Sequence, residues 1–117
     1  MANRILRESI CTSETVNQLT WFEEVCFYRL IVQCDDFGRM DARLPILRAR
    51  LFPLADDVAV AEIGTALDTL ESVGLLERYT VDEMPYLQLV SWEKCQRVRN
   101  KRSRYPPPWP ILEADLD

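Results

Sequence analysis

Six cationic side chains within eleven residues form the densest chemical signal in this sequence. Residues 94–104 hold no acid, and their cations are Lys94, Arg97, Arg99, Lys101, Arg102 and Arg104. Ammonium and guanidinium groups bind phosphate oxygens, and the rings of Tyr105 and Trp109, which follow closely, suit base stacking. The pattern predicts an arm that binds DNA, single-stranded DNA included. If four to six of these cations contact phosphates, the affinity should fall with salt at a log–log slope of about −3 to −5.

The same segment fits a second interpretation, a solubilising linker that leads to another domain. Short basic stretches are common, and a cluster of cations does not by itself identify a binding site. Both interpretations stay open at this point.

A smaller group of cations lies on the helix expected over residues 42–52. Arg48 and Arg50 are candidates for contacts with DNA phosphates, although nearby acids could pair with them instead. For Arg39 and Arg43 we expect such pairing, with partners among Asp35, Asp36, Asp41, Asp56 and Asp57. Exposed ion pairs of this kind contribute typically under ~1 kcal/mol each.

The remaining charge is strongly segregated from the cationic segment. Residues 1–93 carry 8 basic and 16 acidic side chains, and residues 105–117 add three more acids, so the whole chain has a net charge of −5. An acidic body with one positive extension predicts that any grip on DNA comes mainly from that extension.

Catalysis and cofactor binding find no support in the sequence. Without histidine, neither a Ser-His nor a Cys-His nucleophile can form, and the three glycines build no phosphate-binding loop. The paired acids Asp35-Asp36 and Asp56-Asp57 fit turn and helix-capping roles. Four cysteines lack the close spacing of zinc ligands, and Cys26 and Cys34 are expected as small buried apolar residues. We therefore expect no enzyme, no metal and no cofactor.

Length and hydropathy indicate one domain that does not enter a membrane. The 117 residues are 48% hydrophobic, which suffices for a single core, and no run of 18 apolar residues occurs. The first nine residues include Arg4, Arg7 and Glu8 and do not resemble a secretion signal, so a cytoplasmic location is expected.

Periodicity and capping residues predict four helices in the first 73 residues. Thr12 or Ser13 begins a short one with Val16 and Leu19 inward, after an extended stretch anchored by Ile5 and Ile10. The others are expected over 21–34, where Thr20 and Glu23 form a capping box, over 42–52, and from a cap at Asp56 or Asp57 to Val73. The last has an apolar stripe of Val60, Ile63, Leu67 and Leu70.

The strands are expected to be short. Residues 38–42 follow the turn Asp35–Gly38, while 75–81 and 85–92 form a hairpin around a turn at 82–84. Trp21, Trp92, Leu75, Leu76, Leu87 and Leu89 are assigned to the core. The proline-rich stretch 106–110 is expected to be extended rather than packed.

This element order predicts an α+β, mainly α fold: a winged helix-turn-helix with a C-terminal β-hairpin wing and an extended basic tail. Three amphipathic helices bury their stripes against one another, and the hairpin covers the open side. The expected division is a winged-helix domain at 1–93 and a basic, proline-rich arm at 94–117.

Several blocks along the chain form a distinctive set, namely Asp35–Arg39, Leu47–Pro53, Leu70–Leu76, Arg78-Tyr79, Tyr86–Leu89, Trp92–Arg97 and Ser103–Pro106. Together they resemble the N-terminal domain of phage replisome organisers, which are related to DnaD-type replication initiation proteins. The resemblance spans about residues 4–108. It implies a module of phage or prophage replication initiation that binds DNA and assembles with itself and with a helicase or helicase loader.

One departure from the DNA-binding pattern favours alternatives. The second helix of a helix-turn-helix usually enters the major groove, yet the outward positions of residues 57–73 are Glu62, Thr65, Asp68, Thr69, Glu71 and Ser72. A helix face without cations suits contact with a protein better than contact with phosphates. Two alternatives therefore stay open: a protein-interaction winged helix that can associate with itself, and a transcriptional regulator of the same fold.

Overall fold

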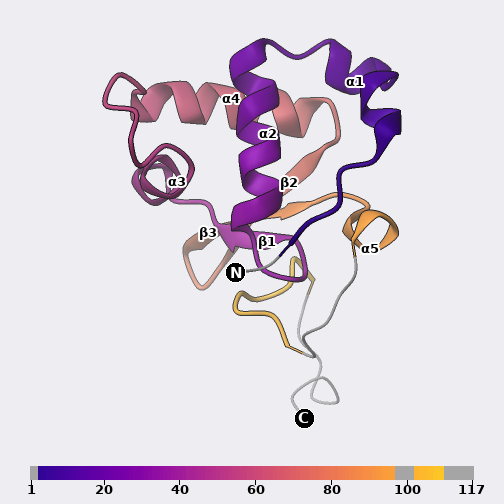
Figure 1. Cartoon of the computed structure of the whole chain (residues 1–117). Coiled ribbons are helices and arrows are strands. Elements are labelled where there is room, and N and C mark those ends of the chain that lie inside the picture. Colours follow the sequence, from indigo (N-terminus) through magenta and orange to yellow (C-terminus); the bar gives the residue numbers. More distant parts are fainter. Residues whose placement is uncertain (1–2, 97–101, 110–117) are drawn as a thin grey trace.

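A computed structural model of the chain describes residues 3–96 and 102–109, apart from the side chains of Glu93 and Lys94 (Figure 1). In chain order the elements are the 3-10 helix η1 (Glu8–Cys11), α1 (Glu14–Asn17), α2 (Trp21–Gln33), β1 (Arg39–Asp41), α3 (Leu44–Leu51), α4 (Val60–Ser72), β2 (Leu76–Val81), β3 (Met84–Leu89) and α5 (Trp92–Cys95). The fold is α+β and mainly helical, as predicted. None of the helices in the described ranges has the length and apolar character needed to cross a membrane.

Of the three helix N-termini predicted from capping residues, two are confirmed. The Ser13 hydroxyl accepts from the Val16 N–H at the start of α1, and Thr20 and Glu23 form the predicted capping box of α2. The predicted cap at Asp56 or Asp57 is wrong, because α4 begins only at Val60 and the Glu62 carboxylate accepts from the Ala59 N–H. Arg48 explains the delay, since its guanidinium holds the loop carbonyls of Ala55 and Val58 at 2.7 and 3.0 Å.

The three strands form one antiparallel sheet in the order β1-β3-β2. Asp82 and Glu83 connect β2 and β3 with positive φ angles of 50° and 68°, the geometry of a two-residue hairpin turn. The returning strand was predicted to reach Trp92, which is wrong: β3 ends at Leu89, and Ser91 adopts a φ of 60°. Trp92 instead begins α5.

Helices α2, α3 and α4 pack against one another on one side of the sheet, and their contact surfaces form the core (Figure 1). The side chains of Leu30, Leu47, Leu70 and Leu87 are completely buried. The predicted burial of Val16, Leu19, Leu76, Leu89 and Trp92, and of Cys26 and Cys34, is confirmed, whereas Leu75 is only partly buried.

Two residues that were predicted to face the core, Trp21 and Val60, are exposed. Trp21 is 82% exposed because it occupies the first helical position of α2, from which Phe22 and not Trp21 turns inward to stack on Phe52. Val60, at the start of α4, is 39% exposed. The predicted anchor Ile5 is also largely exposed, although its backbone is held by Gln96.

The C-terminal stretch 102–109 lies against the face of the sheet opposite the helices (Figure 1). The Tyr79 hydroxyl donates to the Pro106 carbonyl at 2.5 Å, and the Tyr105 ring centroid lies 6.1 Å from that of Tyr86. The expectation that the proline-rich stretch does not pack is therefore wrong for the part described. Two tyrosines on the outer face of β2 and β3 need apolar cover, and this stretch supplies it.

Gly38 permits the turn between α2 and β1 to meet the side chain of Trp92. Its φ is +77°, and a Cβ atom there would stand 2.7–2.9 Å from three indole carbons. The Trp92 indole N–H also donates to the Asp36 carbonyl at 2.6 Å, which fixes the ring in this notch.

Replacing Gly38 should therefore destabilise the protein more than replacing Gly74, which has a similar φ of +84° but no atom within 4 Å of a Cβ. We expect Gly38→Ala to lower the free energy of unfolding by about 2–5 kcal/mol, from left-handed backbone strain plus overpacking. For Gly74→Ala we expect about 1–2 kcal/mol, from the backbone alone. Urea denaturation measures both, and equal losses would show that contact with Trp92 does not constrain the turn.

Candidate nucleic-acid interface

A polar groove of about 740 Å³ lies where the end of α2, the end of α3 and the C-terminal stretch meet. Its cationic lining consists of Arg4, Arg50, Arg102 and Arg104. Asp35 and Asp36 also line it, so the groove is not uniformly positive. The state of each charged group decides what the groove can bind.

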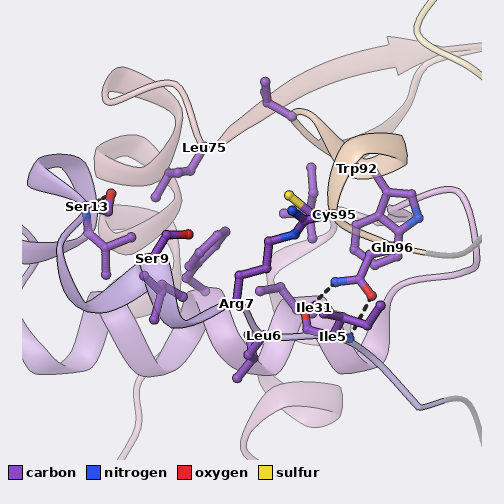
Figure 2. Close-up of a pocket in the computed structure, with 15 residues that line it drawn as sticks. Ile5, Leu6, Arg7, Ser9, Ser13, Ile31, Leu75, Trp92, Cys95 and Gln96 are labelled. Atoms are coloured by element: carbon purple, nitrogen blue, oxygen red, sulfur yellow. Dashed lines mark hydrogen bonds between the residues drawn. The ribbon is translucent and has the colours of Figure 1, made fainter.

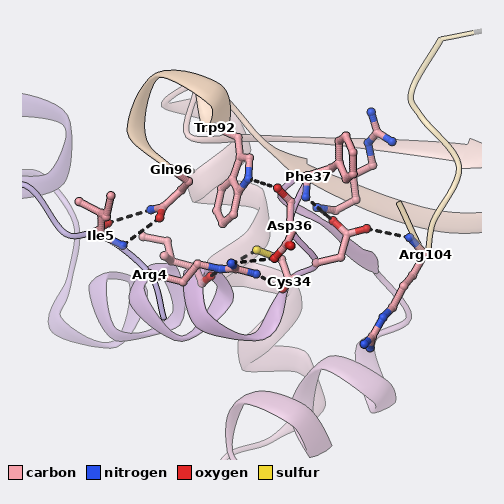
Figure 3. Close-up of polar contacts among 11 residues, drawn as sticks. Arg4, Ile5, Cys34, Asp36, Phe37, Trp92, Gln96 and Arg104 are labelled. Carbon is pink, nitrogen blue, oxygen red and sulfur yellow. Dashed lines mark hydrogen bonds and ion pairs between the residues drawn. The ribbon is translucent and has the colours of Figure 1, made fainter. Parts of the chain in front are cut away.

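Arg4 is a structural part of the groove floor. Its side chain is 5% exposed, forms an ion pair with Asp36 at 2.9 Å and donates to the carbonyls of Ile31 and Cys34 (Figure 3). These carbonyls end α2, where backbone acceptors lack partners within the helix. Its guanidinium carbon also lies 5.2 Å from the ring centroid of Trp92. Arg4 therefore neutralises Asp36 and has little capacity left for a ligand.

Asp35 joins the turn after α2 to the C-terminal stretch. Oδ1 accepts from the backbone N–H groups of Phe37 and Arg39 at 2.9 and 3.0 Å. Oδ2 accepts from the Ser103 hydroxyl and from the Arg104 backbone N–H. The carboxylate thereby fixes residues 103 and 104 at the rim of the groove through a hydroxyl and a backbone N–H. The Arg104 side chain points away from the Asp35 carboxylate (Figure 3).

Three of the predicted phosphate contacts, Arg50, Arg102 and Arg104, are brought together at this groove. All three residues are exposed. Among the residues that the structure describes, Arg50 donates to the neutral Gln33 amide oxygen at 3.3 Å, and no ion pair of Arg50, Arg102 or Arg104 occurs. No acid of the described chain therefore neutralises these three cations.

Arg48 is placed elsewhere, between α3 and the loop before α4. Since its guanidinium is engaged with the carbonyls of Ala55 and Val58, it holds the loop in place. Of the remaining predicted contacts, the Lys94 side chain and all of Arg97, Arg99 and Lys101 lie outside the described residues.

The two predicted ion pairs near β1 differ in outcome. Arg43 pairs with Asp41 at 2.6 Å, as predicted, and this hydrogen bond lowers the pKa of the Asp41 carboxyl. The acidic partner predicted for Arg39 is wrong, because its Nε donates to the Gln88 amide oxygen at 3.0 Å. Arg39 is buried beside the C-terminal stretch, where a neutral acceptor lies across the sheet in register with it.

The outward face of α4 is acidic, as the sequence indicates. Asp68 and Glu71 both bind Arg78 of β2, at 2.6 and 2.8 Å. The Arg78 backbone N–H is the main cause that lowers the pKa of the Glu71 carboxyl, and the guanidinium adds to it. The Glu71 carboxylate therefore stays ionised at neutral pH, and α4 itself supplies no cation for a DNA phosphate.

Sequence reasoning missed a second hollow, an apolar groove of about 210 Å³ between the N-terminal stretch, α2 and the end of β3 (Figure 2). Ile5, Leu6, Phe27, Leu75 and Val90 contribute to its lining. At one end the Gln96 amide closes it by pairing with the backbone N–H and carbonyl of Ile5, both at 2.8 Å. The apolar residues that line this groove are far apart in the sequence, so no local sequence pattern predicts it.

Cys26 and Cys34 are buried, and burial raises the pKa of each thiol to about 12. Both therefore stay protonated near neutral pH.

No protein-family model, curated protein or solved structure matches this chain.

Because the C-terminal stretch packs against Tyr79, we expect this tyrosine to titrate at a higher pH than a free tyrosine. Burial raises the pKa of its hydroxyl to about 12, and a phenolate could no longer donate to Pro106. Because the pKa is higher in the folded state, folding stability should be unaffected below pH ~10 and fall as the pH rises from about 10 towards 12. Absorbance at 295 nm, compared between the parent protein and Tyr79→Phe, isolates this group. A Tyr79 that titrates near 10 would mean that the stretch does not cover it in solution.

Proposed function

We propose that this chain is a winged helix-turn-helix module of phage or prophage DNA replication initiation that binds nucleic acid through its C-terminal basic segment. The observation that carries the binding proposal is the groove at which Arg50, Arg102 and Arg104 gather without an acidic partner of their own in the described chain. The role in replication rests on the resemblance of the sequence blocks.

The order of elements supports the winged-helix interpretation. Helix α2 is followed by a short strand, then by α3 and α4 as a helix-turn-helix, and then by the β2–β3 hairpin as a wing. In the sheet order β1-β3-β2 the hairpin pairs with the strand that precedes the two helices, which ties the wing to the helical body.

Electrostatics favour the groove over α4 as the site of contact. Phosphate binding is dominated by Lys and Arg, and each cation that meets a phosphate releases counterions. The α4 face offers Glu62, Asp68 and Glu71, of which two already hold Arg78. Base reading in the major groove commonly uses Arg, Asn or Gln, which α4 lacks, so a transcriptional regulator is the weaker alternative.

Assembly with proteins is a second candidate function, which the apolar surfaces favour. Trp21, Val25 and Val32 are exposed along α2, and the apolar groove lies between α2 and the N-terminal stretch. Exposed apolar surface of this kind commonly marks a protein contact. A second copy of the chain, a helicase or a helicase loader are the partners to test by light scattering and pull-down. A monomer that captures none of them would argue against this function.

Paired double variants test the binding proposal. Arg102→Ala/Arg104→Ala should weaken binding to labelled oligonucleotides and reduce the magnitude of the log–log salt slope by about 1.4 for single strands. Arg43→Ala/Arg78→Ala removes the same net charge from residues already paired with acids, so its slope should stay near that of the parent protein. Fluorescence anisotropy across a salt series measures both.

Two results would argue against the proposal. One is the absence of binding to any oligonucleotide at low salt and high protein concentration. The other is an equal loss of slope in the two double variants, which would indicate a response to net charge instead of a defined site.

A further inference from the structure

Two aromatic rings lie against the guanidinium of Arg39 on the outer face of the sheet. Its central carbon is 5.2 Å from the ring centroid of Phe37 and 5.1 Å from that of Trp109. Arg39 is 7% exposed, and Gln88 fixes its orientation through a hydrogen bond of 3.0 Å. The indole of Trp109 therefore rests on a cation that is itself immobilised.

Trp109 is nevertheless 54% exposed, which distinguishes it from the other aromatic residues of this region. Tyr105 packs against Tyr86, and Trp92 is buried in the notch at Gly38. With Arg39 against part of its ring system, Trp109 presents the rest of its apolar surface to solvent. A held but uncovered indole is the feature that stacking sites for nucleobases share.

The cations and the indole lie on one anchored stretch of chain. Ser103 and Arg104 are bound to Asp35, and Pro106 is bound to Tyr79. Trp109 lies five positions after Arg104, so their Cα atoms lie at most ~18 Å apart. A short oligonucleotide can therefore contact both at once.

Resting on the proposed function, we infer that Trp109 is a base-stacking platform and that the ligand is single-stranded nucleic acid. Arg102 and Arg104 contact its phosphates, while one base stacks on the indole. In a duplex the bases stack on one another and offer no free face to Trp109, so only unpaired strands gain this contact. The acidic face of α4 agrees with this inference, since duplex binding through that helix is disfavoured.

Trp109→Ala and Trp21→Ala form a matched pair for the test, because each removes one exposed indole. The ligands are a dT12 strand and a blunt 12-base-pair duplex, and binding is measured by anisotropy and tryptophan quenching. Trp109→Ala should weaken dT12 binding by about 5- to 150-fold. It should leave duplex binding and the salt slope unchanged, and the quenching caused by dT12 should disappear.

Trp21→Ala should retain both the affinity and the quenching, and Trp109→Phe should recover part of the affinity. If Trp109→Ala proves poorly folded, Trp109→Phe and the quenching of the parent protein decide the question. Unchanged dT12 binding in Trp109→Ala, or no tryptophan quenching in the parent protein, would overturn the inference while leaving phosphate binding at the groove intact. Failure of the parent protein to bind either ligand would instead defeat the proposed function, and this inference with it.

Discussion

The Asp35 carboxylate is the contact on which the rest of the proposed site depends. It accepts four hydrogen bonds: two shape the turn from α2 into β1, and two hold the C-terminal stretch at residues 103 and 104. A carboxylate beside a phosphate site would normally repel the ligand. Here four donors surround its oxygens, and hydrogen bonds to an ionised group are among the stronger ones in proteins. The acid thereby positions nearby cations and is itself largely screened by its donors.

Local charge placement, more than net charge, governs what this surface attracts. The chain has a net charge of −5, yet Arg50, Arg102 and Arg104 lie at one groove, while Asp68 and Glu71 of α4 are paired with Arg78. At 0.1 M salt, exposed charges more than ~10 Å apart scarcely influence each other. An acidic body therefore weakens long-range attraction to nucleic acid, but it does not cancel a cluster of cations at close range.

The sequence predicted most of the elements because their signals are local. The capping box at Thr20 and the hairpin turn at Asp82-Glu83 depend on neighbouring residues and were placed closely. The errors arose where tertiary contacts decide. Arg48 bonds to loop carbonyls that only the folded chain brings near it, and this delays α4. Of the candidate contacts, Arg50, Arg102 and Arg104 meet at the groove, but nothing in their spacing predicts that α3 and the C-terminal stretch adjoin.

The proline-rich stretch has a sequence that fits either a free arm or a segment packed on the sheet, depending on what lies beside it. Prolines favour an extended backbone without internal hydrogen bonds, which suggests a free arm. That backbone also loses little conformational entropy when it docks, because it is already restricted. On the outer face of the sheet, Tyr105 packs against Tyr86, and the Pro106 carbonyl accepts from the Tyr79 hydroxyl. The C-terminal stretch is therefore held at Ser103 by Asp35 and at Pro106 by Tyr79. Arg104 lies between these two contacts, and under the proposed function this restriction lowers the entropy lost when its side chain binds a phosphate.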